Sequence, residues 1–474
     1  MIDFKLLIDG VERAGSNDVW DEVTDPATEE VIGRVAHATK DDLDLAMNTA
    51  LRGLAEWSAT SPWDRGVIMK RAADILRTRQ DAFAADLTRE MGKPLPEAVA
   101  EVLRSADFLE WGGEQARRIN GVLMQGRDVD HRIAIETHPV GVVAAFTPWN
   151  FPMAQAAKKF AGALGAGCSI ICKPSEETPG SVLNLCRALL EAGVPPAAVG
   201  VVYGVPADIS SYMIPAPQIA KITFTGSIPV GKLLAAEAGR AMKPVTMELG
   251  GHAPVIICND TDAQALADFL VVKKYANAGQ ICMSPTRFFV EADVYEKFVT
   301  RFAQKAEALR VGAGTDAQTQ VGPLLNSRRL SAISDLVEDA RARGARVLTG
   351  GQRVGNTGNF YAPTVLADVD AEARVMREEP FGPIAAIQPF TDEAEMLNAA
   401  NGLEFGLSAY LFTCDANRQR RLTDALKYGT VGVNDVPAHM PEIPLGGWKE
   451  SGYGTEGGQS ILAPFQKTKF VSLR

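Results

Sequence analysis

The feature that most constrains this chain is a regular alternation of short apolar runs and longer helical stretches that begins at Pro139. The apolar runs occupy 140–146, 169–174, 199–204 and 221–227, and helical stretches such as 153–164 separate them. Runs of this kind, rich in β-branched residues, are typical of strands that are buried on both faces. Strand, helix and strand at a spacing of roughly 25–30 residues predict βαβ units and a parallel sheet.

The same alternation restarts after Glu248, which predicts a second α/β unit. We expect strands at 253–258, 287–292, 345–351, 384–390, 408–413 and 429–434, and helices at 262–278, 294–309 and 330–343. The first 120 residues keep a helical stripe of apolar side chains and are expected to be mostly helical. Strands 132–137 and 466–473 belong to no βαβ unit, and we expect them to pair with each other or with another subunit.

Composition and charge exclude several classes of protein. The 474 residues carry a formal net charge of -10 without an acidic or basic block, whereas a duplex-binding protein needs a basic face. The six cysteines form no CxxC pair, so we expect no metal site and no disulfide framework. No apolar run approaches the roughly 20 residues that span a bilayer, and the N-terminus lacks a signal-peptide pattern. We therefore expect a cytoplasmic protein that binds neither nucleic acid nor membrane.

Three motifs place reactive side chains beside predicted strands and helices. Cys282, in AGQICMS, offers a nucleophile if it ionises, and a small buried hydrophobic side chain is the alternative. Glu248, in VTMELGG, ends a strand and suits a general base if burial raises its pKa, with a surface turn as the alternative. Asn150, in PWNFP, offers an amide donor to an oxyanion or, alternatively, an Asx turn.

Two further motifs suit a dinucleotide. FTGS (224–227) ends a strand, and Ser227 is expected to cap a helix whose N–H groups would face a pyrophosphate. No GxGxxG follows the first strand, so the usual Rossmann fingerprint is absent. Lys173 and Glu176 follow strand 169–174 and suit a ribose, where a carboxylate favours NAD over NADP. Ordinary solvated charge is the alternative for both.

In their order along the chain, these motifs resemble those of the aldehyde dehydrogenase superfamily. That order is EMGKP (90–94), PWNFP, KPSEETP, FTGS, MELGG, AGQIC, EEPFGP (378–383) and PLGGWKESGYG (444–454). The chain is most similar to NAD-dependent semialdehyde dehydrogenases of the succinate-semialdehyde type. The resemblance implies an α/β fold with a Rossmann-type NAD-binding domain (1–120 and 140–247), a catalytic domain (248–445) and a β oligomerisation arm (121–139 and 446–474). It also implies a homodimer or homotetramer.

The resemblance assigns a role to each motif. Cys282 resembles the catalytic nucleophile, Glu248 the general base, and Asn150 the oxyanion donor together with the backbone N–H of Cys282. The implied contacts with the cofactor NAD are Trp149, Lys173, Ser175, Glu176, Gly226, Ser227, Glu379 and Phe381. The implied reaction oxidises a small-molecule aldehyde to a carboxylic acid through a cysteine thiohemiacetal and a thioester.

The substrate is implied less closely than the reaction. In semialdehyde dehydrogenases cations hold a carboxylate tail, and Arg287, five residues after Cys282, matches one such position. Lys158 stands where those enzymes usually carry arginine, and His439 stands where serine is expected. These departures leave open an aromatic or differently charged aldehyde and a broad-specificity enzyme, and a structural ion pair is the alternative for Arg287. Glu248 counts against a CoA-acylating enzyme, and Cys282 counts against a non-catalytic protein of the same fold.

Overall fold

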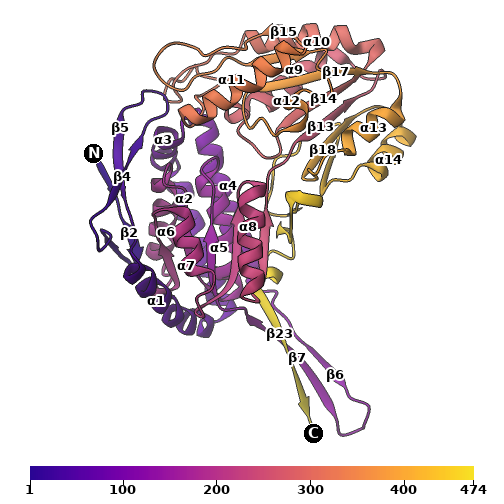
Figure 1. The fold of residues 1–474 in the computed structure, drawn as a ribbon. Coiled ribbons are helices and arrows are strands. Elements are labelled where there is room, and N and C mark those ends of the chain that lie inside the picture. The colour runs from indigo at the N-terminus through magenta and orange to yellow at the C-terminus, as the bar shows by residue number, and fades with distance from the viewer.

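A computed structural model describes residues 1–474, which form two α/β bodies and a projecting β arm (Figure 1). The first body contains an eight-stranded sheet in the order β21-β12-β11-β8-β9-β10-β2-β3. Its inner strands pair in parallel, as predicted. They are β12 (Val245–Glu248), β11 (Ile219–Thr225), β8 (Val142–Phe146), β9 (Ser169–Lys173) and β10 (Val199–Val201). The antiparallel strands β2 (Leu6–Ile8), β3 (Val11–Arg13) and β21 (Gly452–Tyr453) extend its edges.

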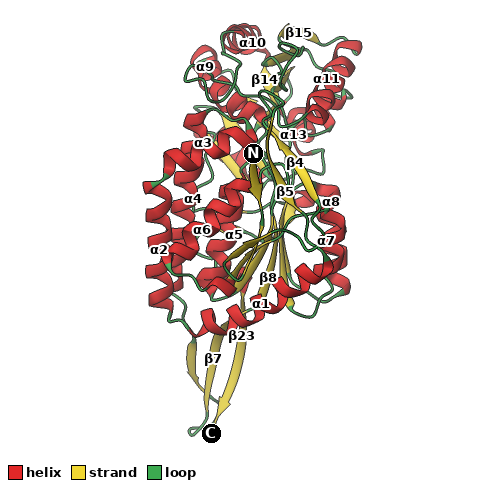
Figure 2. Ribbon diagram, turned by 90° about the vertical axis from the view of Figure 1, so that its left-hand side faces the viewer, coloured by secondary structure: helices red, strands yellow, loops and turns green.

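Helices stand on either side of this sheet (Figure 2). The crossover helices are α5 (Pro152–Ala166), α6 (Pro179–Ala192), α7 (Pro206–Met213) and α8 (Ile228–Arg240). Four more precede β8, namely α1 (Lys40–Ala59), α2 (Pro62–Thr78), α3 (Gln80–Met91) and α4 (Leu95–Ala116). The helical prediction for the N-terminal region is thus confirmed from residue 40 onward. Before it, the chain forms β2, β3 and a small sheet of β1 (Ile2–Phe4), β4 (Trp20–Thr24) and β5 (Val31–Ala36), which the helical interpretation missed.

The second body contains a seven-stranded sheet in the order β15-β16-β17-β14-β13-β18-β19. Its strands are β13 (Ala253–Ile257), β14 (Pro285–Glu291), β15 (Arg346–Thr349), β16 (Thr364–Ala367), β17 (Ile384–Phe390), β18 (Ser408–Phe412) and β19 (Thr430–Val433). Only β15 runs antiparallel to its neighbour. The helices are α9 (Ala263–Tyr275), α10 (Ala292–Glu307), α11 (Ser327–Ala342), α12 (Arg374–Arg377), α13 (Glu393–Asn401) and α14 (Ala416–Ala425). Every strand predicted for this region is present, and β16 is an additional one.

The arm is a three-stranded antiparallel sheet that projects from the first body (Figure 1). It consists of β6 (Val122–Gln125), β7 (Arg132–Pro139) and β23 (Gln466–Leu473). β23 pairs with β7 from Gln466 opposite Pro139 to Leu473 opposite Arg132, which confirms that these two isolated strands pair with each other. The short strands β20 (Pro444–Leu445) and β22 (Glu456–Gly457) and the 3₁₀ turns η1 (Pro196–Ala198), η2 (Ala276–Gly279), η3 (Lys449–Ser451) and η4 (Ala463–Phe465) complete the chain.

Two separate hydrophobic cores underlie the two bodies. The first spans residues from Phe4 to Leu249 and takes in three residues near the C-terminus, and the second spans Ala253 to Val436. The chain crosses between them at Gly250 and Gly251, directly after β12. A Cβ on Gly251 would lie only 2.4 Å from the carbonyl oxygen of Cys282, so glycine permits a close backbone approach here. Glu248 and Cys282 therefore lie where the two bodies meet. No helix is long and apolar enough to cross a membrane.

Candidate active site

A cavity of about 540 Å³ lies between the two bodies and contains Cys282. Helix α4 contributes Glu97, Arg104 and Phe108 to its lining, and helix α5 contributes Gln155 and Lys158. The remaining lining comes mainly from the segments around 271–285 and 436–439. The cavity is typical of a small-molecule site in its volume and in its lining, which is mainly apolar with a few polar groups.

Cys282 lies in a tightly turned loop after η2. Asn277, Ala278 and Gly279 all have left-handed φ values, of 49°, 53° and 72°, and a Cβ on Gly279 would clash with the carbonyl of Gly382. Such strain in non-glycine residues persists only where the surroundings fix it, and it is typical of functional loops. Burial raises the pKa of the Cys282 thiol to about 12, Glu379 and Glu248 add to that rise, and Lys158 opposes it. The resting thiol is therefore neutral.

Asn150 is held against this loop from two sides. Its side-chain amide donates to the carbonyl of Gln280 at 3.0 Å, two residues before Cys282. Its backbone carbonyl accepts from Lys93 Nζ at 2.8 Å and from Asn277 Nδ2 at 3.1 Å. One N–H of the Asn150 amide remains without a protein partner, and the Asx turn considered as an alternative does not form. A rigid amide beside the thiol is the geometry that an oxyanion donor requires.

A buried ion pair that sequence reasoning missed supports Asn150. Lys93 Nζ lies 2.5 Å from Glu101 Oε2, and both side chains are fully buried. Glu101 Oε1 accepts from the backbone N–H groups of Met153 and Ala154, at the first turn of α5, where the helix dipole favours a carboxylate. The EMGKP motif indicated Lys93 without giving it a role, and nothing in the sequence indicated Glu101.

Glu248 ends β12 and is buried, with 3% of its surface exposed, so the surface-turn alternative is wrong. Neither of its carboxylate oxygens has a hydrogen-bond partner within the protein. Burial raises the pKa of Glu248 well above its ordinary value, Glu456 raises it further, and Lys158 and Lys159 oppose the rise. The group is thus a weak acid whose conjugate base is well matched to proton transfer near neutral pH.

Two lysines and one glutamate form a buried cluster beside Glu248. Lys159 Nζ lies 2.5 Å from Glu456 Oε1, and Lys158 Nζ lies 3.2 Å from Glu456 Oε2. Lys159 also donates to Thr225 Oγ1 at 2.8 Å. Burial alone would raise the pKa of Glu456, but Lys159 and Lys158 together lower it to about 2. Lys158, which we expected to contact a substrate tail, is therefore already paired with a carboxylate. Sequence reasoning missed both Lys159 and Glu456.

The residues expected to contact the adenosine half of a dinucleotide gather at the carboxyl ends of β9 and β11. Lys173 forms an ion pair with Glu176, and burial lowers the pKa of Lys173. The Ser175 hydroxyl accepts from the backbone N–H of Glu177 at 3.3 Å. Ser227 occupies the N-cap position of α8, as predicted, yet it makes no side-chain capping bond and stays exposed. This helix N-terminus is therefore open to an anion.

Residues from distant motifs, which were expected to contact the nicotinamide half of a cofactor, also lie together. The rings of Trp149 and Phe381 contact edge to face, with centroids 5.4 Å apart. Glu379 Oε1 accepts from the backbone N–H of Gly251 at 3.0 Å, and burial raises the pKa of Glu379 to about 7. A Cβ on the neighbouring Gly250 would lie 2.4 Å from Glu379 Oε2, so a larger residue there would displace the carboxylate.

The expected site continues around Gly226, whose backbone N–H donates to the carbonyl of Glu248 at 3.1 Å. This bond ties the FTGS turn to the end of β12. Six of the eight expected cofactor residues therefore lie at the carboxyl edge of the first sheet, which is where α/β sheets bind dinucleotides, and Glu379 and Phe381 face this edge from the second body, in the segment between α12 and β17.

Arg287 does not line the cavity, and its contacts contradict the expectation that it holds a substrate tail. It is 2% exposed, and its guanidinium donates to the carbonyls of His252, Ala399 and Ala400 and to the hydroxyl of Tyr428. All these acceptors are neutral, so the ion-pair alternative is also wrong. The residue connects β14 to the end of α13, since an arginine fork can satisfy several carbonyls together.

His439 does line the cavity, but it is not the cation that its position suggested. Burial lowers the pKa of His439 well below its ordinary value, and Lys158 and Arg104 lower it further. Its ring lies 5.2 Å from that of Phe108. Its Nε2 atom is buried without a hydrogen-bond partner. The neutral imidazole therefore contributes a wall to the cavity, with its Nε2 turned toward Gly457.

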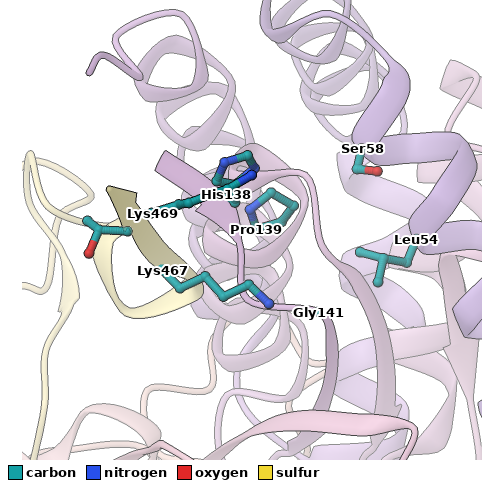
Figure 3. Close-up of a pocket in the computed structure, with 8 residues that line it drawn as sticks. Leu54, Ser58, His138, Pro139, Gly141, Lys467 and Lys469 are labelled. Carbon is teal, nitrogen blue, oxygen red and sulfur yellow. The ribbon is translucent and has the colours of Figure 1, made fainter. Parts of the chain in front are cut away.

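A second hollow, of about 590 Å³, lies at the base of the arm (Figure 3). Its lining includes Leu54 and Ser58 of α1, His138 of β7, and Lys467 and Lys469 of β23. It contains no cysteine and no buried carboxylate. This hollow therefore offers none of the reactive groups that lie around Cys282.

Comparisons with known proteins agree with this geometry. The model of the aldehyde dehydrogenase family matches residues 14–471. The 4-(hydroxymethyl)benzenesulfonate dehydrogenase of Comamonas testosteroni is 42% identical over 467 residues, which cover 98% of this chain and 97% of that one. The NADP(+) succinate-semialdehyde dehydrogenase of Escherichia coli is 36% identical over 469 residues, 99% and 97% of the two chains. The crystal structure of betaine aldehyde dehydrogenase from Staphylococcus aureus in complex with NAD+ superposes with a TM-score of 0.96, at 30% identity, over 99% and 95% of the two chains.

The fold and these comparisons together define an oxidoreductase, with a cysteine, a carboxylate and an amide gathered where the two bodies meet. The chain belongs to the aldehyde dehydrogenase family, as its ordered motifs predicted.

Proposed function

We propose that this protein oxidises an aldehyde that carries an anionic group to the corresponding carboxylic acid, with NAD as the cofactor. The observation that carries the proposal is the arrangement around Cys282, which lines a cavity that also has cationic side chains in its lining. The amide of Asn150 is fixed against the Cys282 loop, and the buried carboxylate of Glu248 lies close enough to raise the pKa of Cys282. A binding scaffold of the same fold would have no need of this arrangement.

The chemistry follows from the three groups. The sulfur of Cys282 attacks the aldehyde carbon to form a thiohemiacetal, while the thiol proton leaves to a base and the oxyanion accepts from Asn150 and the backbone N–H of Cys282. Loss of hydride from that carbon gives a thioester. Glu248 takes a proton from water, whose oxygen attacks the thioester carbon, and Cys282 leaves as the acid is released. Lys158 favours each anionic form at Cys282 by its charge.

The residues present fit a nicotinamide dinucleotide. When bound, NAD supplies the acceptor for the hydride that the substrate carbon loses. Ser227 and the N-terminus of α8 would hold its pyrophosphate, and Glu379 would hold the nicotinamide ribose. Trp149 and Phe381 form an aromatic wall beside that position. Glu176 supports NAD over NADP, because a carboxylate beside the 2′-hydroxyl repels a 2′-phosphate.

Two substrate groups suit the cavity. A semialdehyde such as succinate semialdehyde is supported by the names of the related proteins and by the cations of the lining. Aromatic aldehydes are supported by Phe108 and Phe151 in the lining and by the benzenesulfonate substrate in the name of a relative. We also propose the domain boundaries. The NAD-binding domain comprises 1–120 with 140–247, and the catalytic domain comprises 248–445. The arm, 121–139 with 446–474, joins two or four copies of the chain.

An aldehyde panel with NAD and with NADP tests the proposal. The panel contains succinate semialdehyde, benzaldehyde, 4-carboxybenzaldehyde and hexanal, and formation of reduced cofactor is followed by absorbance. We expect the acid aldehydes to have the largest kcat/KM and NAD to be preferred. Equal kcat/KM values for hexanal and the acid aldehydes would refute the anionic substrate, and a lack of turnover with every aldehyde would refute the oxidation itself.

A further inference from the structure

One cation in the lining of the catalytic cavity has no partner within the protein. Arg104 lies on α4, seven residues after Glu97 and four before Phe108, so these side chains share one face of the helix. Arg104 is half-buried, and no ion pair or hydrogen bond engages its guanidinium. A half-buried arginine in a cavity usually has an anionic partner, because its charge is costly to desolvate alone.

The acidic groups nearest along α4 are already engaged elsewhere. Glu101 is paired with Lys93, and Glu97 accepts from the backbone N–H of Asn277 at 2.8 Å. Neither carboxylate therefore neutralises Arg104. Lys273, at another part of the cavity lining, lies over the ring of Phe269 and also has no carboxylate partner.

The two cations Lys158 and Arg104 differ in their partners. Lys158 is paired with Glu456, and it is the cation that opposes the rise in the pKa of Cys282. Arg104 has no such partner, and one turn further along α4 lies Phe108, whose ring contacts that of His439. Arg104 is therefore a cation of the lining that is free to bind an anion.

His439 is the neutral neighbour of Phe108 in the same lining. Its ring lies against that of Phe108, and its Nε2 is buried close to Gly457 without a hydrogen-bond partner. Because that nitrogen has no accessible surface, the imidazole contributes a wall to the cavity and leaves Arg104 as the group that binds an oxyanion.

We propose that Arg104 is the residue that selects the substrate, by binding an oxyanion at the far end of an aromatic aldehyde. This inference rests on the proposed function, and it replaces Arg287 as the tail contact. The aromatic spacer follows from the same lining, in which Phe108 and Phe151 offer flat surfaces and Ile281 an apolar one. A sulfonate and a carboxylate share the required chemistry, since both are anions that present two oxygens to an arginine fork.

Kinetics with matched aldehydes test this inference. The substrates are 4-sulfobenzaldehyde, 4-carboxybenzaldehyde and the neutral isostere 4-formylbenzenesulfonamide, and the variants are Arg104→Gln, Arg104→Lys and Arg118→Gln. Arg118 is exposed just beyond the end of α4 and serves as the control for a change of charge outside the cavity. We expect Arg104→Gln to lower kcat/KM for both anionic aldehydes by about 10–100-fold, mainly through KM, because the lost contact is with a group remote from the reaction.

The neutral sulfonamide should change less than about threefold in the same variant, and Arg104→Lys should recover part of the loss, since it keeps the charge but not the fork. The ratio of the losses with sulfonate and carboxylate identifies which of the two anions Arg104 fits better. Equal losses with the anionic and neutral aldehydes would overturn the inference, because Arg104 would then be structural. If Arg104→Gln still has a higher kcat/KM for the anionic aldehydes than for the sulfonamide, by the same factor as the wild type, the inference would also be overturned. The proposed function would then be unaffected.

Calorimetric binding of 4-toluenesulfonate, which cannot be oxidised, tests the contact without turnover. We expect its affinity to fall in Arg104→Gln and to remain unchanged in Arg118→Gln. Binding that is equal in the wild type and in Arg104→Gln would overturn the inference even if every aldehyde were oxidised. If the wild type oxidises no aldehyde but binds 4-toluenesulfonate more tightly than Arg104→Gln does, the proposed function would be refuted and this inference would not.

Discussion

Replacing Arg287 with alanine should destabilise the second body without changing the choice of substrate. The substitution leaves the carbonyls of His252, Ala399 and Ala400 and the hydroxyl of Tyr428 without their charged donor, in a region that is almost fully buried. Each unsatisfied buried group costs about 1–3 kcal/mol, but the groups are neighbours and water can reach some of them, so we expect about 3–5 kcal/mol in total.

For a body of this size, that loss should lower the midpoint of thermal unfolding by about 5–15 °C. Circular dichroism on heating measures it, and kcat/KM for one anionic and one neutral aldehyde is measured below the transition. Arg301→Ala is the matched control, because Arg301 forms a part-exposed ion pair with Asp268 at 2.7 Å, and solvent screening makes the loss of such a pair cost little stability. A midpoint equal to that of Arg301→Ala, or a loss of activity confined to the anionic aldehyde, would refute the structural role of Arg287.

Three other substitutions test the chemistry. Cys282→Ala should abolish formation of reduced cofactor while NAD titration stays nearly unchanged, and substantial residual turnover would exclude it as the nucleophile. Glu248→Gln should give a burst of reduced cofactor followed by a slow steady rate, because the amide cannot take a proton from water; an equal fall in both phases would mean that Glu248 only orients other groups. Glu176→Ser should reduce the ratio of kcat/KM with NAD to kcat/KM with NADP. Repulsion of about 1–3 kcal/mol between Glu176 and a 2′-phosphate corresponds to a reduction of up to roughly 5–150-fold. Equal kcat/KM values with the two cofactors in the wild type would contradict the role of Glu176.

The sheets were predictable because their strands are continuous apolar runs, as buried parallel strands must be. β13 begins at the predicted residue and ends one residue early, and β17 matches its predicted bounds. The strands of residues 2–36 escaped prediction because they are three to six residues long, too short for a clear period. The motif residues could be predicted because most of them follow an apolar run directly. The glycine and proline residues beside them mark in the sequence where each strand or helix ends.

Charged side chains on helices were harder to assign, because one sequence does not show which face of a helix meets the cavity. Arg287 followed Cys282 closely and was expected in the site, but it lies on β14 with its side chain turned into the second body. Arg104 lies far from every motif, and only the packing of α4 against α5 brings it to the cavity. Glu456 reaches Lys159 across 297 residues, because β22, which pairs with β20, packs against α5.

The buried cluster also explains how a thiol with a raised pKa can act as a nucleophile. Glu456 is the one carboxylate that pairs with both lysines, and burial raises the pKa of Glu248, which favours its uncharged form. The cluster therefore holds an excess of positive charge while both lysines keep their protons. Water cannot screen that charge at this depth, and it therefore favours an anion nearby. The anions available are the Cys282 thiolate and the oxyanion that replaces it after attack on the aldehyde. Burial of the cluster thus costs the resting enzyme stability, and that cost is recovered when negative charge develops at the reacting atoms.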